Sequence, residues 1–301
     1  MILAVTGGTG FVGQRLIDLA IERGHQVQAL TRRPQDSRDG VDWIEGSLED
    51  RDVLERLVTG SDAVIHVAGV INARDAAGFE AGNVTGTLSM LAAATAAGTR
   101  RFVHVSSLAA REPKLSQYGA SKARSEELVN RSGLDWVIVR PPAVYGPGDK
   151  ETLELFRMAK AGLILLPPRG RLSLIHVDDL ARLLLSLAER DSPEKEVIEP
   201  DDGRPDGWTH REFASALGRA VGRRAVALAT PRPLLRLGAA VDRFVRRDKA
   251  KLTPDRAAYF CHPDWVVSAS SAPAEVVWRP EVATEQGLAQ TADWYRAKGW
   301  L

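Results

Sequence analysis

The sequence predicts an α/β fold in which the first half of the chain forms a doubly wound, parallel sheet. Short apolar runs alternate there with segments whose apolar residues recur every three or four positions, as on one face of a helix. The runs are apolar throughout, which is typical of strands that are buried on both faces. A glycine-rich turn follows the first run directly. Ligands of such sheets bind at the carboxyl ends of the strands.

Six apolar runs are predicted to be strands, at residues 2–5, 27–30, 41–44, 63–67, 102–105 and 136–139. Helical spacing predicts helices over residues 11–20, 53–58, 152–161, 177–188, 211–221, 234–244 and 286–298. The alternation loosens after Tyr145, where "GPGDK" predicts a loop. We therefore expect one domain over 1–150, to which segments near 173–190 return, and a smaller part over 151–301.

Composition narrows the classes of partner. The 301 residues are 44% hydrophobic and 26% charged, as in ordinary globular proteins. The 40 basic and 39 acidic residues nearly cancel, so the net charge favours neither nucleic acid nor an anionic membrane as a partner. The single cysteine, Cys261, allows no intramolecular disulfide and no thiolate zinc cluster, and it favours a reducing compartment.

No targeting or metal-binding signal stands out. The start "MILAVTGGTGFVG" lacks a basic segment and its apolar run is broken by glycines, so we expect no signal peptide. No apolar run is long enough to cross a bilayer, which predicts a cytoplasmic protein without stable membrane insertion. The histidines have no metal-ligand spacing and are interpreted as structural or exposed: His25, His66, His104, His176, His210 and His262.

The turn "AVTGGTGFVG" places three glycines between the first strand and the first helix. Glycine permits a sharp turn and a close approach to a pyrophosphate, while the helix N-terminus offers free N–H groups and a positive dipole. Strand, glycines and amphipathic helix together predict a dinucleotide site in a Rossmann-like domain over 1–150. The residues expected to contact the cofactor here are Gly7, Thr9, Gly10, Phe11, Val12 and Gly13.

The second strand predicts the type of dinucleotide. An acidic residue at its end normally holds the adenosine ribose in enzymes that use NAD. Here the strand runs into Thr31, Arg32 and Arg33, and a guanidinium can pair with a 2′-phosphate. We therefore predict NADP over NAD as the cofactor. The alternative is that both arginines are simply solvated.

Seven motifs in order resemble the extended short-chain dehydrogenase/reductase family, closest to the branch of 3β-hydroxysteroid dehydrogenases and dihydroflavonol reductases. This branch shares its frame with sugar-nucleotide epimerases and dehydratases. The motifs cover about the first 180 residues: "TGGTGFVG" at 6–13, "HVAG" at 66–69, "NVTGT" at 83–87, "VSS" at 105–107, "YGASK" at 118–122, "RPPAVYGPGD" at 140–149 and "IHVDDLA" at 175–181.

The resemblance implies a catalytic group. Tyr118 would protonate the carbonyl oxygen, and Lys122, four residues on and on the same helical face, would supply charge and hold the nicotinamide ribose. A phenol with a pKa near ~10 needs such a neighbouring cation to act near neutral pH. Ser107 would hydrogen-bond the substrate oxygen, with Ser106 as the alternative. Asn83 would support the lysine or approach the substrate, or else cap a helix.

Further cofactor contacts are implied at the ends of later strands: Ser47, Leu48, Val67, Ala68, Gly69, Ser106, Lys122, Pro141, Ala143 and Val144. The imidazole of His66 need not react. The pair Asp178 and Asp179 is interpreted as the start of a helix, where the dipole favours carboxylates.

Two departures from the sugar-nucleotide enzymes weaken that alternative. Ser107 and Tyr118 are only 118 − 107 = 11 residues apart, and Arg171 stands one place before the position where those enzymes often carry an arginine. We therefore expect an NAD(P)-dependent oxidoreductase that interconverts a ketone and a secondary alcohol on a fairly apolar small molecule. The alternatives are a sugar-nucleotide epimerase or dehydratase, and a non-catalytic NADP-binding sensor or assembly factor. The family also makes a homodimer possible.

The substrate-binding part is expected over 151–301. Its segment 232–247 has an apolar helical face opposite a basic face. Such a helix packs on the core with its arginines solvated, or else covers an apolar substrate or contacts a membrane surface.

Overall fold

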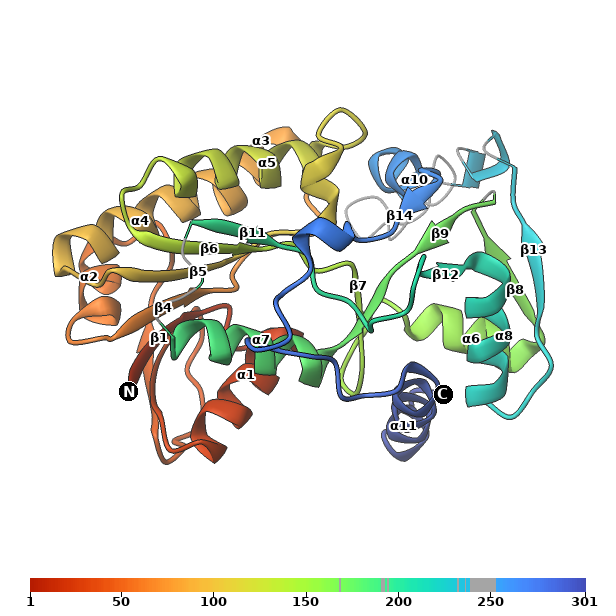
Figure 1. The fold of residues 1–301 in the computed structure, drawn as a ribbon, viewed down its shortest axis with the longest axis horizontal. Coiled ribbons are helices and arrows are strands. Elements are labelled where there is room, and N and C mark those ends of the chain that lie inside the picture. Colours follow the sequence, from red (N-terminus) through yellow and green to blue (C-terminus); the bar gives the residue numbers. More distant parts are fainter. Residues whose placement is uncertain (168, 191–192, 194, 232, 236, 239–252) are drawn as a thin grey trace. The chain divides into compact units, whose positions relative to one another are not determined.

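The computed structural model describes residues 1–301 except 168, 191–192, 194, 232, 236 and 239–252 (Figure 1). The chain divides into two compact units. The first unit comprises Met1–Pro141, Asp178–Glu199 and Ser271–Arg279, and the second comprises Pro142–Val177, Pro200–Ser270 and Pro280–Leu301. The first stretch ends at Pro141 and not at residue 150, and Asp178–Glu199 joins the first unit near the expected 173–190, whereas Ser271–Arg279 is a further segment.

The first unit is built on a parallel seven-stranded sheet. Its described strands follow the order β11-β6-β5-β4-β1-β2-β3, so the strand order reverses beside β1, between β1 and β4. A reversal of this kind is where doubly wound sheets bind ligands. The strands are β1 (Ile2–Thr6), β2 (Gln26–Thr31), β3 (Val41–Glu45), β4 (Ala63–His66), β5 (Arg101–Val105), β6 (Asp135–Val139) and β11 (Glu196–Ile198).

Burial explains the continuous apolar pattern of the central strands. Every residue of β4 and β5 is buried, and both strands have neighbours on each side. The expectation of burial on both faces is wrong for β3, an edge strand in which Asp42 and Glu45 are exposed and Ile44 alone is buried. The seventh strand, β11, was not expected, because its three residues follow a charged stretch and show no apolar run.

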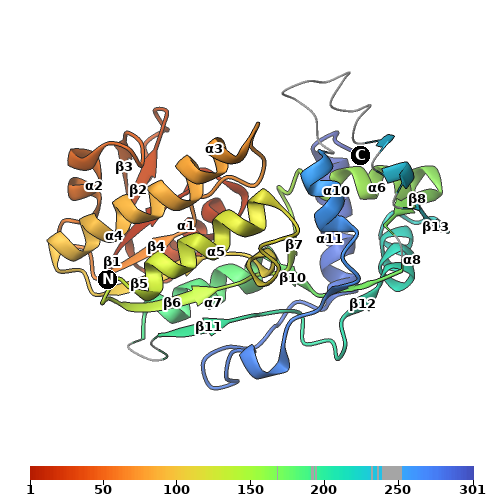
Figure 2. The ribbon, with the colours of Figure 1, turned by 90° about the horizontal axis from the view of Figure 1, so that it is seen from above.

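Helices cover both faces of this sheet (Figure 1). On one face lie α2 (Arg51–Val58), α4 (Gly86–Ala97) and α5 (Gln117–Asn130), whose apolar residues join the core, and α4 and α5 run side by side (Figure 2). On the other face lie α1 (Phe11–Glu22) and α7 (Val177–Ala188), joined by an ion pair of 2.7 Å between Arg15 and Asp178. This pair is one reason why the segment from Asp178 belongs to the first unit.

Short helices complete the first unit at the edge where the strands end. They are α3 (Ala76–Phe79), the π-helix η1 (Glu80–Thr85) and the 3-10 helix η2 (Leu108–Arg111). η1 leads directly into α4. A π-helix closes i→i+5 hydrogen bonds and occurs mostly as a single turn, frequently at functional sites.

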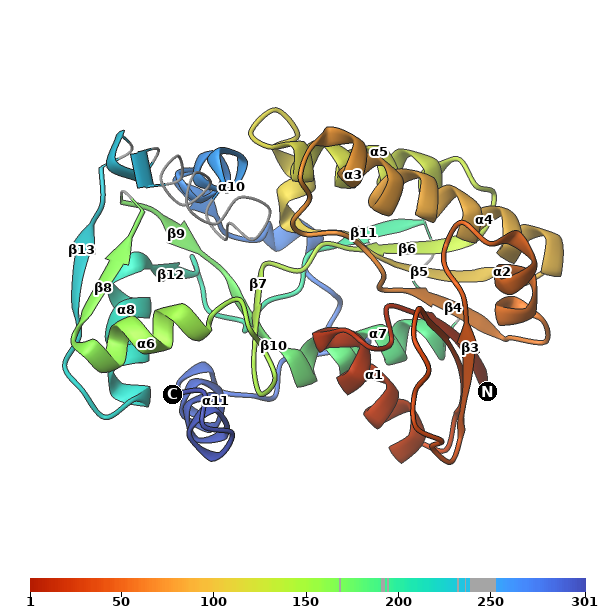
Figure 3. The same ribbon diagram turned by 180° about the vertical axis from the view of Figure 1, so that it is seen from behind.

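The second unit has its own apolar core, and Figure 3 shows the helices and strands of this unit from behind. Residues of α6 (Leu153–Ala161), α8 (His210–Ala220) and α11 (Thr284–Ala297) pack in it. The remaining described elements are β7 (Ala143–Tyr145), β8 (Leu163–Leu166), β9 (Arg171–Leu172), β10 (Leu174–His176), β12 (Trp208–Thr209), β13 (Val226–Ala229), α10 (Pro254–Phe260), β14 (Asp264–Trp265) and the 3-10 helix η4 (Ala269–Ser271).

Two sequence interpretations, the helix within 232–247 and the lack of a membrane-spanning segment, are compared with the described residues only. Most of the expected helix over 234–244, and of the segment 232–247, lies outside the described residues. Among the helices that the structure does describe, none combines the length and the apolar character that crossing a membrane requires.

Two leucines on α4 test the packing of the first unit. Leu91 is buried in the core at 5% exposure, whereas Leu88 is 53% exposed on the same helix. We expect Leu91→Ala to lower the free energy of unfolding by about 2–5 kcal/mol, because it removes buried methyl groups and leaves a cavity. Leu88→Ala should change it by no more than about 0.5 kcal/mol. Urea denaturation measures both, and equal losses would contradict this packing.

Candidate functional site

The glycine turn after β1 is closed tightly on itself. The N–H of Gly10 donates to the carbonyl oxygen of Gly7 at 2.9 Å, and Gly7 has a φ of 73°, a conformation that side chains rarely permit. A Cβ added at Gly13 would lie 2.1 Å from the carbonyl oxygen of Gly7. These two glycines are therefore required by the turn itself.

The same turn packs against the end of β4, where the strand order reverses. A Cβ added at Gly7 would lie 2.7 Å from the backbone nitrogen of Ala68. The N–H of Val67 donates to the carbonyl oxygen of Thr6, and that of Ala68 donates to the Thr6 hydroxyl at 3.2 Å. The backbones of the two turns are thus held together, with Val67 and Ala68 half-buried beside the glycines.

The start of α1 fits a dinucleotide pyrophosphate. Its N-cap is Gly10, no side chain caps it, and no acidic residue lies in its first turn. Thr9 and Gly10 are exposed, while Phe11 and Val12 are half-buried. A helix N-terminus with this glycine cradle presents backbone N–H groups and positive dipole to an anion.

The ends of β2 and β3 hold the residues predicted to meet the adenosine half. Arg32 and Arg33 are exposed, and no ion pair engages either guanidinium in the described part of the chain. Thr31 fixes the backbone there, because its hydroxyl donates to the carbonyl oxygen of Arg33 at 2.6 Å. Ser47 accepts from a backbone N–H two residues on, and Leu48 packs on α4 at Gly86.

Lys122 is the buried cation of the site. Its side chain is 3% exposed, and its Nζ donates to the carbonyl oxygen of Val105, the last residue of β5, at 3.0 Å. A Cβ added at Gly69 would lie 2.9 Å from this Nζ, so the glycine leaves room for the ammonium. Burial lowers the pKa of Lys122 to about 8, against an opposing effect of Glu126, one turn along α5.

Asn83 joins the ends of these elements. Its side-chain oxygen accepts from the N–H of Val70 at 2.7 Å, and its Nδ2 donates to Val70 O at 3.0 Å and to Ser121 Oγ at 2.9 Å. It is buried inside η1, so the alternative that it caps a helix is wrong. The amide holds the loop after β4 against the helix that carries Lys122.

Local packing sets the start of α5, where Tyr118 lies. Ser116 caps the helix by accepting from the N–H of Gly119 at 2.9 Å. A Cβ added at Gly119 would lie 2.7 Å from the carbonyl oxygen of Ala109 in η2, so the glycine allows close approach of the two helices. Tyr118 is half-buried, with its ring centroid 6.1 Å from that of Phe79.

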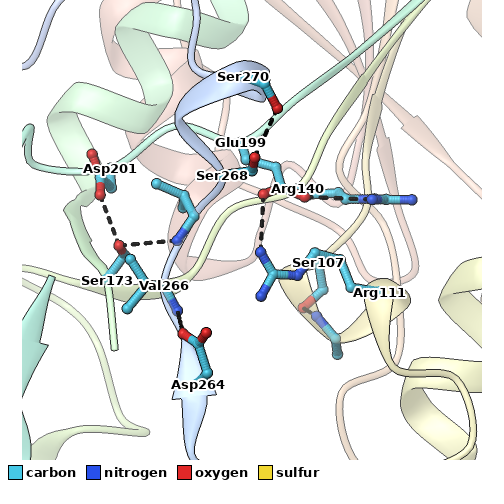
Figure 4. Close-up of polar contacts among 12 residues, drawn as sticks. Ser107, Arg111, Arg140, Ser173, Glu199, Asp201, Asp264, Val266, Ser268 and Ser270 are labelled. Atoms are coloured by element: carbon cyan, nitrogen blue, oxygen red, sulfur yellow. Dashed lines mark hydrogen bonds and ion pairs between the residues drawn. The ribbon is translucent and has the colours of Figure 1, made fainter. Parts of the chain in front are cut away.

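The two candidate serines have different partners. Ser107 caps η2, accepting from the N–H of Ala109 at 3.2 Å (Figure 4). Ser106 donates to Glu126 Oε1 at 2.5 Å. Because Ser106 is engaged by this carboxylate, the geometry favours Ser107 as the serine available to a ligand.

Two histidines stack behind Lys122. The rings of His66 and His104 lie 5.5 Å apart, and both residues are buried. Burial, with the nearby Lys122, lowers the pKa of His66 to about 3 and that of His104 well below its ordinary value. His66 bonds the hydroxyls of Thr6 and Thr87, which makes it structural, as the sequence interpretation held.

The residues expected at the nicotinamide end fall in both units. Pro141 ends the first unit after β6, and its carbonyl oxygen accepts from the N–H of Leu108. Ala143 and Val144 lie on β7 of the second unit, where they pair with β10. No group of three or more His, Cys, Asp or Glu side chains that could hold a metal occurs in the part of the chain with described coordinates.

Sequence reasoning missed four charged residues beside the serines: Arg111, Glu126, Arg140 and Glu199. Only Glu126 had a usable signal, since it follows Lys122 by four residues on one helical face.

Comparison with known proteins identifies the family of the chain. The model of the NAD dependent epimerase/dehydratase family matches residues 3–199, which contain the glycine turn, Tyr118 and Lys122. The chain belongs to this NAD-dependent family. Its members share the oxidoreductase frame of the short-chain dehydrogenases/reductases, and the chain is an oxidoreductase of that type.

Two curated relatives of the family match over nearly their full length. A ceramide reductase of Caulobacter vibrioides is 38% identical over 309 residues, covering 100% of this chain and 96% of the relative. A 2-alkyl-3-oxoalkanoate reductase of Stenotrophomonas maltophilia is 32% identical, with 96% and 97% covered.

Solved structures support the family fold. The Bordetella bronchiseptica enzyme WbmG in complex with NAD superimposes with a TM-score of 0.76 at 21% identity, over 100% of this chain and 95% of that one. MoeE5 in complex with UDP-glucose and NAD gives 0.75 at 22% identity, with 99% of each chain covered. At this identity the likeness extends to the fold alone.

The buried lysine predicts an unusual pH dependence of stability. Its pKa is about 8 in the folded protein and near 10.5 when unperturbed, so between these values the unfolded chain binds the extra proton. Stability due to this group therefore rises with pH across that window. We expect the unfolding free energy of wild type, relative to Lys122→Met, to increase as pH rises from about 8 to about 10.

Chemical denaturation at several pH values measures this difference. Lys114→Met, at an exposed lysine, is the matched control for the loss of one positive charge. The burial of the ammonium would be contradicted if the difference in unfolding free energy between wild type and Lys122→Met changed with pH no more than the difference between wild type and Lys114→Met.

Proposed function

We propose that this protein is an NADP(H)-dependent ketoreductase that reduces a ketone on an apolar, long-chain molecule to a secondary alcohol. One observation carries the proposal. The ammonium of Lys122 is buried at the carboxyl end of β5, one helical turn from Tyr118, in a unit whose glycine turn fits a dinucleotide. A buried positive charge one helical turn from a phenol supports this proposal, because a nearby cation lowers the pKa of a phenol that transfers a proton to a ketone oxygen.

Each residue has a role in this proposal. The chemistry that a reduced nicotinamide would supply when bound is hydride for the carbonyl carbon. Tyr118 donates its phenolic proton to the carbonyl oxygen, and Lys122 lowers the pKa of that phenol. Ser107 donates a hydrogen bond to the oxygen as negative charge develops on it. Asn83 keeps the helix bearing Lys122 in place through Ser121.

The class of substrate rests on the relatives. Their names, ceramide reductase and 2-alkyl-3-oxoalkanoate reductase, are those of enzymes for molecules with long apolar chains, and a third relative, from Stigmatella aurantiaca, is a ketoreductase whose named substrate bears a 3-oxo and a farnesyl group. This third match covers 67% of the chain at 34% identity. We infer a ketone flanked by long alkyl chains, with ceramide-like lipids as the first choice.

A panel of substrates tests the function. We expect purified protein to oxidise NADPH in the presence of a ceramide carrying a 3-oxo group or a 2-alkyl-3-oxo acid, read as loss of absorbance of the reduced nicotinamide. Tyr118→Phe should lower kcat by at least ~100-fold while the Kd for NADPH stays within about threefold, because only the proton donor is removed.

Three outcomes would contradict the proposal. Unchanged turnover by Tyr118→Phe would remove the assigned acid. Conversion of a sugar nucleotide without net loss of NADPH would instead favour an epimerase. Tight NADPH binding with no turnover across the panel would favour a sensor or assembly factor.

The two arginines after β2 test the choice of cofactor. We expect Arg32→Ala and Arg33→Ala together to raise the KM for NADPH about tenfold or more and to leave the KM for NADH nearly unchanged, because only NADPH carries the 2′-phosphate. The control is Arg131→Ala, because Arg131 is an exposed arginine that follows α5. A lower KM of the wild-type protein for NADH than for NADPH would contradict the assignment of NADP as the cofactor.

A further inference from the structure

A series of hydrogen-bonded charged side chains begins at the hydroxyl of Ser106. Ser106 directly precedes Ser107, the proposed hydrogen-bond donor to the substrate oxygen. Glu126 Oε1 accepts from the Ser106 hydroxyl at 2.5 Å and from Arg140 Nε at 2.9 Å, and its Oε2 accepts from Arg140 Nη2 at 2.6 Å. The carboxylate is 7% exposed, and this two-point contact with a guanidinium fixes its orientation.

The series continues to a second buried carboxylate. Arg140 Nη1 donates to Glu199 Oε1 at 3.4 Å, and Arg111 Nη1 donates to Glu199 Oε2 at 3.3 Å. Figure 4 shows Glu199 between these two guanidinium groups. Glu199 is 2% exposed, and its own N–H donates to the carbonyl oxygen of Ser271 at 2.7 Å. This bond fixes the main chain of Glu199, and the two guanidinium groups hold its carboxylate.

The first and last residues of this hydrogen-bonded series, Ser106 and Arg111, lie on one short segment of the polypeptide. Ser106 begins that segment, Ser107 caps η2, and Arg111 is the last residue of η2. Side chains thus run from Ser106 through three charged residues back to Arg111 and form a closed ring with the backbone of 106–111. All of its members belong to the first unit.

The charges in this ring cancel, with two carboxylates against two guanidinium groups. Removing one charge leaves the opposite charge buried without its partner, which costs several kcal/mol in known cases. Replacement of a buried ion chain by apolar residues is often no less stable, so stability alone does not account for such a chain. Its placement around Ser107 indicates a task at the site.

Glu126 also lies one helical turn after Lys122 on α5. The titratable groups that act on Lys122 are Glu126 on the same helix, His66 on β4 and His104 on β5. Both histidines have lowered pKa values and are neutral at physiological pH, so Glu126 supplies the negative charge that favours the ammonium form. Arg140 partly offsets that charge from the other side.

We propose that Glu126, Arg140, Glu199 and Arg111 are positioning residues, which hold the Ser106–Arg111 segment so that Ser107 meets the substrate oxygen, and that Glu126 also keeps Lys122 charged. The proposal rests on the proposed function of this site. It assigns Glu126 two separable effects, one of geometry through Ser106 and one of charge through Lys122.

Two substitutions at Glu126 separate these effects. Glu126→Gln keeps the size of the side chain and removes its charge. We expect it to lower kcat about 10- to 100-fold, with a KM within about threefold of the wild-type value. The alkaline fall, that is the decrease of kcat at high pH, should move to lower pH, because Lys122 then loses its proton more easily. Glu126→Asp keeps the charge but not the reach, so it should lower kcat without moving that fall.

Glu127→Gln is the matched control, since it removes the same charge at an exposed position one residue along the helix. Its kcat and its pH profile should equal those of wild type. Glu199→Gln breaks the ring at its far end and leaves the pair of Glu126 with Arg140. It should lower kcat and leave the alkaline fall in place.

A second measurement needs no turnover. Titration of protein with ¹³C-labelled lysine by NMR, with the Lys122 signal identified by its absence in Lys122→Met, follows the ammonium directly. We expect that signal to titrate at lower pH in Glu126→Gln than in wild type or Glu127→Gln. If no ketone is reduced by wild type, the proposed function fails and this titration still tests the charge effect.

The results that overturn the proposal are equally specific. Equal Lys122 titration in Glu126→Gln and Glu127→Gln would remove the charge effect. Wild-type kcat in Glu199→Gln and Glu126→Asp, with circular dichroism confirming that both are folded, would remove the positioning effect.

Discussion

The burial of the Lys122 ammonium is the constraint on which the arrangement of the site depends. A charge removed from water must be given hydrogen-bond partners, and here it bonds the carbonyl oxygen that ends β5. The glycine at 69 leaves room for it, because a Cβ there would lie 2.9 Å from the Lys122 Nζ. The neighbouring elements are tied to the same point, since Asn83 connects the loop after β4 to Ser121 on the lysine's own helix. The end of β5, the loop after β4 and the helix α5 are therefore fixed relative to one another by these contacts.

The glycine turn imposes the second constraint, and the parallel sheet connects it to the first. Gly7 and Gly13 let the turn close at the end of β1, against the backbone of Ala68 after β4. The strands β1, β4 and β5 are consecutive neighbours, so the anion cradle and the buried lysine lie at the same edge of one sheet. That placement follows from topology, and it is the reason why doubly wound sheets bind dinucleotides at this edge.

Sequence reasoning reached the parts of the molecule that local patterns encode. The glycines, the strand runs and the Tyr118–Lys122 spacing are local, and the fold and family that they indicated are confirmed. The π-helix around Asn83 has no sequence pattern of its own, and the edge position of β3 depends on which strands pair. The ring through Arg140 and Glu199 joins residues 59 positions apart, which no spacing rule connects. Such partners become visible only when the strand order is known.

We propose that the site reduces a ketone with NADPH and does not recycle its cofactor within each turnover. The most direct measurement uses NADPH deuterated at the transferable C4 position together with a ceramide that carries a 3-oxo group, and mass spectrometry of the product. We expect one deuterium on the carbinol carbon for each NADPH consumed. An alcohol product without deuterium, or a converted substrate with no NADPH consumed, would contradict it.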